Sequence, residues 1–377
     1  MDFSYSEEQT LLRNSVAKFL ADHYDFESYK KISRSEAGWS RSVWKQFAEL
    51  GLLAAPLPEE FGGLGGGAVD TMIIMEEFGR ALVVEPFAST VVVGGGFLRH
   101  GGSAAQKEKW LSKIADGSTV MAFAFAEPEG RYNFADLTTT AKRNGSGYTL
   151  NGQKAVVLSA PHADVLIVSA RTAGSRRDAK GVSVFLVDRN AKGVSTRDYP
   201  TIDGLRASEI SFDNVDLPAE ALLGTVDEGL GLIERVTDEA IAAHTAEAAG
   251  AMKVLLDTTV EYTKTRKQFG VPIGKFQVLQ HRMVDMFIQA EQTTSMALMV
   301  TLKLDEGETE RKKAASAAKV QLGKGGRFVG QQAVQLHGGM GMTDELNVGH
   351  YFKRLALLDT LYGNVDHHLK RYAALSD

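Results

Sequence analysis

The sequence contains no cysteine among its 377 residues. This absence excludes disulfide bonds, thiolate nucleophiles and cysteine-ligated metal centres, and it fits a reducing cytoplasm. The sequence also lacks any long block of like charge, since 42 Lys and Arg face 47 Asp and Glu for a formal net charge of -5. We therefore do not expect nucleic acid as a partner.

An uninterrupted hydrophobic run that could cross a membrane is also missing. The most apolar stretch, 81–98, holds Glu85, Pro86 and three consecutive glycines, which a membrane-spanning helix tolerates poorly. We expect a core helix and a loop there. The first twelve residues carry acids where a secretion signal carries Lys or Arg. These features together predict a cytoplasmic protein.

The composition predicts a compact protein with more than one structural unit. The chain is 44% hydrophobic and 24% charged, which excludes a mainly disordered protein. Its length exceeds the usual range of one domain, so two or three units are expected.

The first part of the chain has apolar residues at helical spacing. A capping box is predicted at Ser4 and Glu7, before the first helix. Pro and Gly at 56–67 end one helix and force a loop before an apolar helix that begins near Val69. We predict an N-terminal helical domain over 1–120.

The middle part, 121–225, changes to a period of two. Three dipeptides typical of turns separate the predicted strands: Asn144-Gly145, Asn151-Gly152 and Asp203-Gly204. Several short strands with no helical pattern among them predict a β-barrel or sandwich.

The last part, 226–377, returns to helical spacing. Its apolar stripes predict four long helices, around 229–265, 276–304, 310–336 and 345–375. The whole chain is thus expected to be mainly α with a central β domain. We expect an active site where the parts meet.

Four stretches carry a resemblance to a known family. They are PEEFGGLG at 58–65, AEPEGRYNFADLTTTA with NGQK at 126–154, RKQFGVPIGKFQ at 266–277 and QLHGGMGMTDE at 335–345. In this order and spacing they resemble the acyl-CoA dehydrogenase family over essentially the whole chain. The resemblance implies an N-terminal helical domain, a middle β-barrel and a C-terminal four-helix bundle.

The resemblance also implies a chemistry. In this family a carboxylate removes the α-proton of an acyl-CoA thioester while the β-hydrogen leaves as hydride to the flavin of FAD. The carboxylate has to lie in a dry pocket, and the flavin needs hydrogen-bond donors around its ring and pyrophosphate. An electron-transfer flavoprotein is the implied electron acceptor.

The usual base of the family is replaced. Where relatives have Tyr-Glu-Gly-Thr, this chain reads YGNV at 362–365, with Gly363 in place of glutamate. A second location for the base corresponds to Ala240, and Glu239 lies one residue away, about 100° around a helix. Asp366 and Glu239 stay open as relocated bases. The alternatives are a solvated terminal-helix residue for Asp366 and a solvated or cation-paired residue for Glu239.

Contacts to the flavin ring are altered as well. The positions whose hydroxyls bind flavin and phosphate in relatives are Ala126 and Tyr132 here, and the Trp-x-Thr that packs on the ring corresponds to Val156 and Leu158. The polar contacts that the resemblance implies for the ring are therefore largely lost.

Contacts that relatives make to the flavin site of a neighbouring subunit are retained. The matching residues are Arg266, Phe269, Gln277, Gln335 and Gly339. An arginine fork can grip a pyrophosphate, and a glycine lets the backbone approach a ligand closely. The alternatives are helix-end charge for Arg266 and helix termination for the glycines.

This split pattern suggests a non-catalytic subunit. The sequence resembles the small-subunit type of pimeloyl-CoA dehydrogenase, in which an α₂β₂ assembly joins such a chain to a catalytic acyl-CoA dehydrogenase subunit and shares FAD across the interface. The substrate class would be a bulky or dicarboxylic acyl-CoA, in β-oxidation of fatty acids or steroid side chains. The alternatives are a competent FAD-dependent dehydrogenase with a relocated base and a flavin-free assembly or CoA-binding protein.

A few further residues complete these expectations. Asp238 and Arg206 lie near places where relatives contact CoA, whereas the family's arginine corresponds to Ile241. Glu247, flanked by small residues, is expected in packing and hydrogen bonding. The histidines do not form a convincing metal set, so no catalytic metal is expected.

Overall fold

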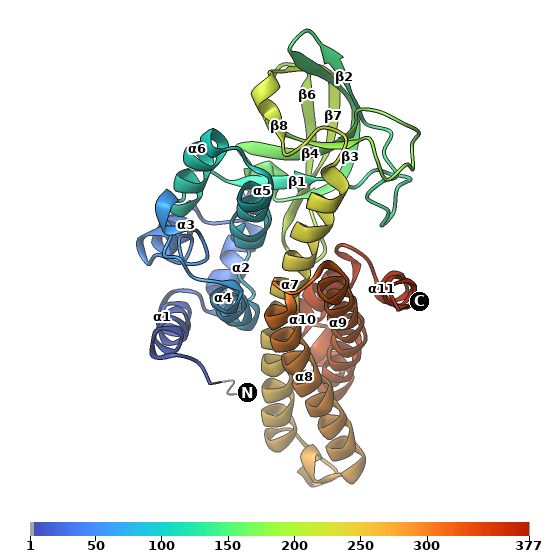
Figure 1. Cartoon of the computed structure of the whole chain (residues 1–377). Helices are drawn as coiled ribbons and strands as arrows, with labels where there is room; N and C mark the ends of the chain where they lie inside the picture. The colour runs from blue at the N-terminus through green and yellow to red at the C-terminus, as the bar shows by residue number, and fades with distance from the viewer. Residues whose placement is uncertain (1–3, 377) are drawn as a thin grey trace. The chain divides into compact units, whose positions relative to one another are not determined.

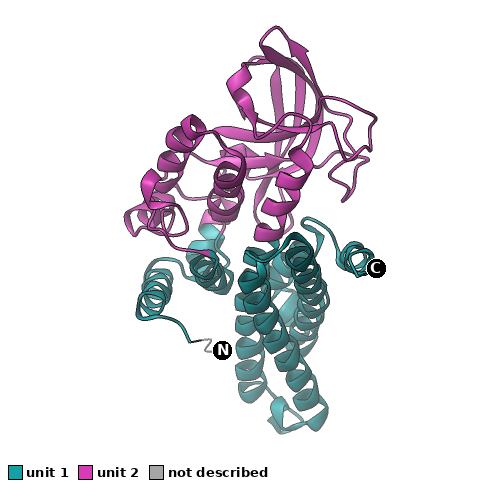
Figure 2. Cartoon of the chain, viewed as in Figure 1, with its two compact units in different colours: residues 1–31, 68–83, 241–377 teal, residues 32–67, 84–240 magenta. Residues whose placement is uncertain are grey.

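The computed structural model describes residues 4–376 of the chain. Figure 2 shows two compact units. Unit 1 consists of Met1–Lys31, Ala68–Val83 and Ile241–Asp377, and unit 2 consists of Ile32–Gly67 and Val84–Ala240. Both units therefore combine segments that are far apart in the sequence.

The described residues include eleven α-helices (Figure 1). In chain order they are α1 (Glu7–His23), α2 (Phe26–Arg34), α3 (Arg41–Glu49), α4 (Ala68–Ala81), α5 (Gly95–Gly101), α6 (Ala104–Ala115), α7 (Gly229–Thr265), α8 (Gln277–Lys303), α9 (Glu308–His337), α10 (Val348–Thr360) and α11 (Val365–Ala374). The helix expected near Val69 is α4, and the apolar stretch 81–98 forms a loop, a π-helical turn and the start of α5.

The first helix begins two residues later than its predicted capping box. Ser6 is the N-cap of α1 and accepts a hydrogen bond from the Gln9 amide, while the Gln9 side chain accepts one from the Ser6 amide. The prediction of Ser4 and Glu7 was wrong because both pairs have the same three-residue spacing. Glu7 lies instead in the first turn, where its charge complements the helix dipole.

The bundle of unit 1 is built around α9, which packs against α8, α10 and α11. Small and branched side chains form one of its buried clusters: Ile241, Ala242, Val300, Leu304, Ala314, Ala315 and Ala318. Alanines let helix backbones approach closely while they bury apolar surface. The Ala-rich sequence of α9 therefore explains its central position.

The last predicted helix, 345–375, is two helices in the structure. The chain leaves α10 at Leu361 and re-enters helix at α11, where Asn364 is the N-cap and accepts a hydrogen bond from the His367 amide. Tyr362 and Gly363 between them have φ angles of 57° and 118°. These values end a helix, and the second is accessible mainly to glycine.

The β domain lies in unit 2. Its eight strands are β1 (Met121–Ala124), β2 (Thr140–Asn144), β3 (Gly147–Leu158), β4 (Val165–Arg171), β5 (Val182–Asp188), β6 (Val194–Pro200), β7 (Arg206–Leu217) and β8 (Leu222–Leu223). They pair in the order β6-β7-β3-β2-β4-β5-β8, and β1 pairs with β4 in parallel. Every residue of β4 is buried, as expected for a strand in the middle of a core.

The predicted turns are correct at two of three places. Gly145, with φ 59°, lies in the hairpin between β2 and β3, and Gly204, with φ 91°, lies between β6 and β7. Gly152 is not in a turn: it lies inside β3 at a register shift against β7. Its φ of 145° and the close approach of Thr139 explain why glycine stands there.

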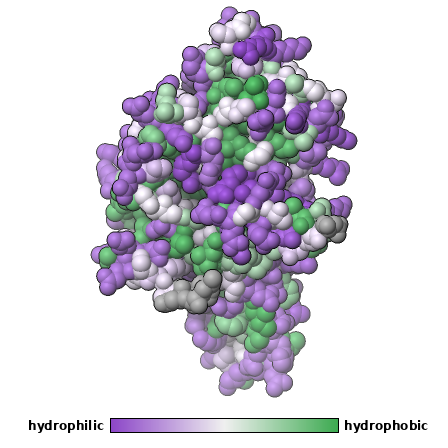
Figure 3. Space-filling view, in the orientation of Figure 1, coloured by the Kyte–Doolittle hydropathy of each residue, from purple (hydrophilic) through white to green (hydrophobic). Residues whose placement is uncertain are grey.

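The architecture confirms a mainly α fold with a central β domain. A short hairpin of β9 (Lys267–Gln268) and β10 (Val271–Pro272) joins α7 to α8. The face seen in Figure 3 is mostly hydrophilic, with smaller hydrophobic areas between the polar ones. None of the helices within residues 4–376 is long and apolar enough to cross a membrane.

Candidate functional site

The residues expected to contact a neighbour's flavin gather at one end of the bundle in unit 1. Tyr262, near the end of α7, stacks on the ring of His337, the last residue of α9, with 4.3 Å between ring centroids. The Tyr262 hydroxyl also lies 3.4 Å from the His337 carbonyl oxygen. The ends of α7 and α9 therefore lie together, and the β9–β10 hairpin leads from α7 to the start of α8.

All five of these residues are exposed in the chain. They are Arg266, Phe269, Gln277, Gln335 and Gly339. Phe269 is 91% exposed and has a φ of 53°, and its ring meets that of Phe276 edge to face at 6.1 Å. A bulky residue at positive φ is uncommon, and so is a phenylalanine with almost no burial. The hairpin thus presents an aromatic ring outward from unit 1.

The three glycines after α9 differ in their backbone angles and in the atoms packed against them. Gly338 is the C-cap of α9 with a φ of 59°, and Gly341 is buried against the backbone of Val334. A side chain at Gly339 would instead meet no described atom within 4 Å. The positive φ accounts for Gly338 and packing within the chain accounts for Gly341, whereas neither accounts for Gly339, which leaves open space for a ligand or a second chain.

In unit 2, the positions that match the flavin-ring contacts of relatives carry no Thr or Ser hydroxyl at Ala126, Val156 or Leu158. Val156 is 52% exposed, with a φ of 51°, and its amide points to the Glu209 carboxylate at 3.3 Å. Glu209 is held by the Tyr199 hydroxyl at 2.7 Å. Ala126 and Leu158 contribute apolar side chains. An occupied amide and a nearby carboxylate do not fit a ring that needs donors and gains electrons.

The position of the usual base is closed by packing. Gly363 is buried with a φ of 118°, and a Cβ there would lie 2.5 Å from His367 Cδ2 and 2.7 Å from His368 Nε2. His368 Nε2 also lies 3.0 Å from the Tyr362 carbonyl oxygen. Burial, with Lys319 nearby, lowers the pKa of His368 to about 3. A glutamate at 363 would therefore require both a strained backbone and displacement of a buried ring.

Glu239 is buried beside two arginines and a histidine, which occupy both of its oxygens. Its oxygens lie 2.8 Å from Arg99 Nη2, 2.6 Å from His100 Nε2 and 3.2 Å from Arg235 Nε. Burial raises the pKa of Glu239, but the hydrogen bond from His100 and the charges of Arg99 and Arg235 outweigh it, so the pKa lies below its ordinary value. A carboxylate held in this way is a poor proton acceptor.

Asp366 and Glu247 have different surroundings. Asp366 is exposed in the first turn of α11, a setting where a carboxylate stabilises the helix dipole. Glu247 is buried, 2.8 Å from His244 Nδ1 and 2.6 Å from Arg354 Nε. Burial opposes ionisation of Glu247, but Arg354 and His244 lower its pKa to about 2. Glu247 therefore has the packing and hydrogen-bonding role expected of it.

The two residues considered for CoA are engaged or buried. Arg206 Nη2 donates to the carbonyl oxygens of Ser33 and Ser35 at 3.2 and 2.8 Å, and its stem fills the space beside Gly38. Asp238 is fully buried. Arg206 Nη2 already donates to the carbonyl oxygens of Ser33 and Ser35. This engagement argues against binding of a CoA phosphate by Arg206.

The burial of Lys319 was not predicted from the sequence. Lys319 on α9 is 1% exposed, and its Nζ donates to the carbonyl oxygens of Leu358 and Asp359 at 2.5 and 2.9 Å, at the end of α10. Burial, opposed in part by Asp359, lowers its pKa to about 7. Lys319 follows Ala315 by four residues and precedes Leu322 by three, so it lies on the same buried face of α9. This spacing is the feature of the sequence that could have predicted its burial. Within residues 4–376, no group of three or more His, Asp or Glu side chains could hold a metal ion.

Comparison with known proteins identifies the family of the chain. Family models described as the N-terminal, middle and C-terminal domains of acyl-CoA dehydrogenase match residues 6–118, 122–215 and 227–374. The acyl-CoA dehydrogenase FadE12 of Mycobacterium tuberculosis is 33% identical over 356 residues, which cover 92% of this chain and 90% of that protein.

Two solved structures extend the similarity to the whole fold. A variant of the Tcur3481-Tcur3483 steroid ACAD has a TM-score of 0.89 and 29% identity, covering 98% of each chain. The ChsE4-ChsE5 complex from Mycobacterium tuberculosis has a TM-score of 0.90 over 99% of this chain and 98% of that one, and at 24% identity it shows the fold alone. The chain therefore belongs to the acyl-CoA dehydrogenase family.

Proposed function

We propose that this chain is the non-catalytic subunit of a heteromeric acyl-CoA dehydrogenase and that it completes the FAD site of a catalytic partner. One contrast carries the proposal: the residues that would contact a neighbour's flavin are present and exposed, while the chain's own base position is closed at Gly363. Heteromeric relatives of the same fold support this assignment.

The exposed end of unit 1 would form the shared part of the site. Arg266 would bind the FAD pyrophosphate through its guanidinium fork, because paired donors match paired phosphate oxygens. Phe269 would lose most of its exposed surface against the partner, and Gly339 would let backbone approach the adenosine. Gln277 and Gln335 would add hydrogen bonds. When bound, FAD supplies the acceptor for the hydride.

The partner would supply the base. Within this chain, the two carboxylates considered for that role are unsuited to it, because Glu239 is tied to two arginines and a histidine and Asp366 is exposed to water. The substrate class proposed is an acyl-CoA thioester with a bulky or dicarboxylic acyl group, including steroid side chains, as the name of one structural relative suggests. An electron-transfer flavoprotein would accept the electrons, and the assembly would be an α₂β₂ tetramer.

The test is the FAD content of the protein with and without its partner. We expect the chain purified alone to be colourless, and the complex with a co-expressed catalytic acyl-CoA dehydrogenase subunit to hold about half an FAD per chain. A chain that alone holds one FAD and oxidises acyl-CoA would overturn the proposal in favour of a competent enzyme. A complex without FAD would favour a flavin-free assembly protein.

A comparison of two arginine variants tests whether Arg266 contributes to the shared FAD site. Arg266→Gln should leave assembly intact but lower the FAD content of the complex, because a pyrophosphate contact is lost. Arg143→Gln is the matched control, since Arg143 is an exposed arginine on β2 in unit 2. Equal FAD content in the two variants would contradict a role for Arg266 in cofactor binding.

A further inference from the structure

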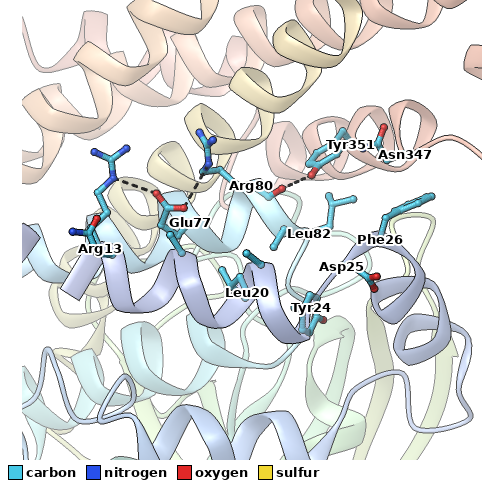
Figure 4. A pocket seen from close by; sticks show the side chains of 14 residues that line it. Arg13, Leu20, Tyr24, Asp25, Phe26, Glu77, Arg80, Leu82, Asn347 and Tyr351 are labelled. Atoms are coloured by element: carbon cyan, nitrogen blue, oxygen red, sulfur yellow. Dashed lines mark hydrogen bonds and ion pairs between the residues drawn. The ribbon is translucent and has the colours of Figure 1, made fainter. Parts of the chain in front are cut away.

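Unit 1 contains a hollow that the proposed function does not use (Figure 4). Its volume is about 560 Å³, and its wall is formed by α1, the start of α2, the end of α4 and α10. This size is typical of sites for small organic molecules. The hollow has a charged end and an apolar end, and each end restricts the chemistry of a ligand.

At the charged end, two guanidinium groups share one carboxylate. Glu77, with a side chain only 7% exposed, lies 3.3 Å from Arg13 Nε and 3.5 Å from Arg80 Nε. Figure 4 shows Glu77 between the two arginines. Burial raises the pKa of the neighbouring Glu76, whose charge also faces Lys253. Around Glu76 and Glu77 stand three cations, Arg13, Arg80 and Lys253, which leaves one positive charge in excess near this end.

The same arginines have unused donors. Arg80 Nη1 is buried and has no hydrogen-bond partner within residues 4–376. Arg13 is engaged there through Nε alone, and 41% of its side chain is exposed. Both Glu77 oxygens are already occupied. The Arg13 and Arg80 side chains are 41% and 32% exposed, so an incoming carboxylate would accept hydrogen bonds from the exposed donors of these two groups, whereas a cation would be repelled.

The other end of the hollow is apolar. Leu20, Phe26 and Leu82 contribute its side chains, and Ala17 of α1 leaves room beside them. Asp25 lies at this end, opposite Arg13 in Figure 4, and accepts a hydrogen bond from the Ser28 amide at 2.8 Å. An apolar ligand body would gain by burial here. A second carboxylate on the ligand would meet the charge of Asp25.

We propose that this hollow binds an amphipathic monocarboxylate, with the carboxylate at Arg13 and Arg80 and the apolar body against Leu20 and Leu82. The ligand class is a free aliphatic or aromatic acid, without CoA. The site lies wholly within unit 1, so it needs neither FAD nor the catalytic partner.

The experiment is calorimetric titration of the full chain with octanoate, octanol, octylammonium and octanedioate. We expect octanoate to bind at least tenfold more tightly than the other three. Arg13→Gln should weaken octanoate binding about tenfold, and Ala17→Trp should abolish it by filling the hollow. Arg143→Gln should bind like the unmodified chain.

Two outcomes would overturn the proposal. The first is unchanged octanoate affinity in both Arg13→Gln and Ala17→Trp, which would put the ligand elsewhere, for example in an acyl-CoA site. The second is equal affinity for octylammonium and octanoate, which would remove the role of the guanidinium groups. Circular dichroism of each variant establishes that it is folded. Arg13→Gln changes the charge of the hollow, whereas Ala17→Trp changes its volume.

Discussion

Gly363 offers the sharpest test of the closed base position. In Gly363→Ala the added Cβ takes a backbone angle of 118° that side chains rarely adopt, which costs about 1–3 kcal/mol. The same Cβ would lie 2.7 Å from the ring of the buried His368, and overpacking of this kind costs about 1–3 kcal/mol more. His367 is half-buried and can move, so its contact adds little.

We therefore expect Gly363→Ala to lower the free energy of unfolding by about 3–5 kcal/mol, or the melting temperature by roughly 5 °C. Urea denaturation and calorimetry of the full chain measure both quantities. Gly145→Ala is the matched control, because Gly145 also has a positive φ, 59°, but no atom near its added Cβ. Its cost should be about 1 kcal/mol.

The difference between the two variants isolates the steric contribution at Gly363. His368→Ala in the Gly363→Ala background should recover part of that contribution, as a double-mutant cycle would show. A Gly363→Ala chain as stable as the Gly145→Ala control would refute the reasoning. Gly363→Glu, which restores the family's residue, should be destabilised further and should not create turnover.

Three further predictions concern buried and exposed charges. The pKa of Lys319 is lowered to about 7 in the folded chain, so above that pH the unfolded state binds more protons, and the free energy of unfolding should rise from pH 7 towards pH 10 by up to about 1.4 kcal/mol per pH unit. Urea denaturation at several pH values should show a smaller rise for Lys319→Met. An equal rise in the two proteins would contradict this prediction. Glu247→Gln removes the carboxylate that lies 2.6 Å from the Nε of the buried Arg354 and should cost about 3–5 kcal/mol. Because the pKa of Glu247 is lowered to about 2, its stabilisation in the parent should be lost as pH falls from about 4.5 to 2. Acid titration of both proteins checks this. Glu239→Gln and Asp366→Asn should keep the turnover of the complex with its catalytic partner, and loss of turnover with FAD still bound would instead identify a relocated base.

Much of the fold was predictable because the relevant signals are local. The change of hydrophobic period placed helices and strands, and the turns at Gly145 and Gly204 follow from residues that adopt positive φ. Gly152 misled the prediction, since the same dipeptide chemistry serves a turn and a bulge. The break before α11 was missed because the helical period continues across it, although Gly363 stood at the break.

The candidate site was predictable in identity but not in arrangement. Matching motifs selected Arg266, Phe269 and Gly339, but only the stacking of Tyr262 on His337 shows that the ends of α7 and α9 lie together. The contacts of Glu239 with Arg99 and His100 could not be predicted from the sequence, because these two residues are about 140 residues away from it.

The sequence by itself determined the family, the order of helical and β parts, and the replacement of the base by Gly363, since these depend on residue identity and local spacing. The tertiary structure decided which polar groups are buried and what they contact. In the tertiary structure Glu239 forms ion pairs and Arg206 donates to backbone carbonyl oxygens. Lys319 is buried at the end of α10, and a hollow lies beside Arg13. The physical reason is that burial and long-range contacts set the pKa and availability of a side chain, and both depend on elements far apart in the chain.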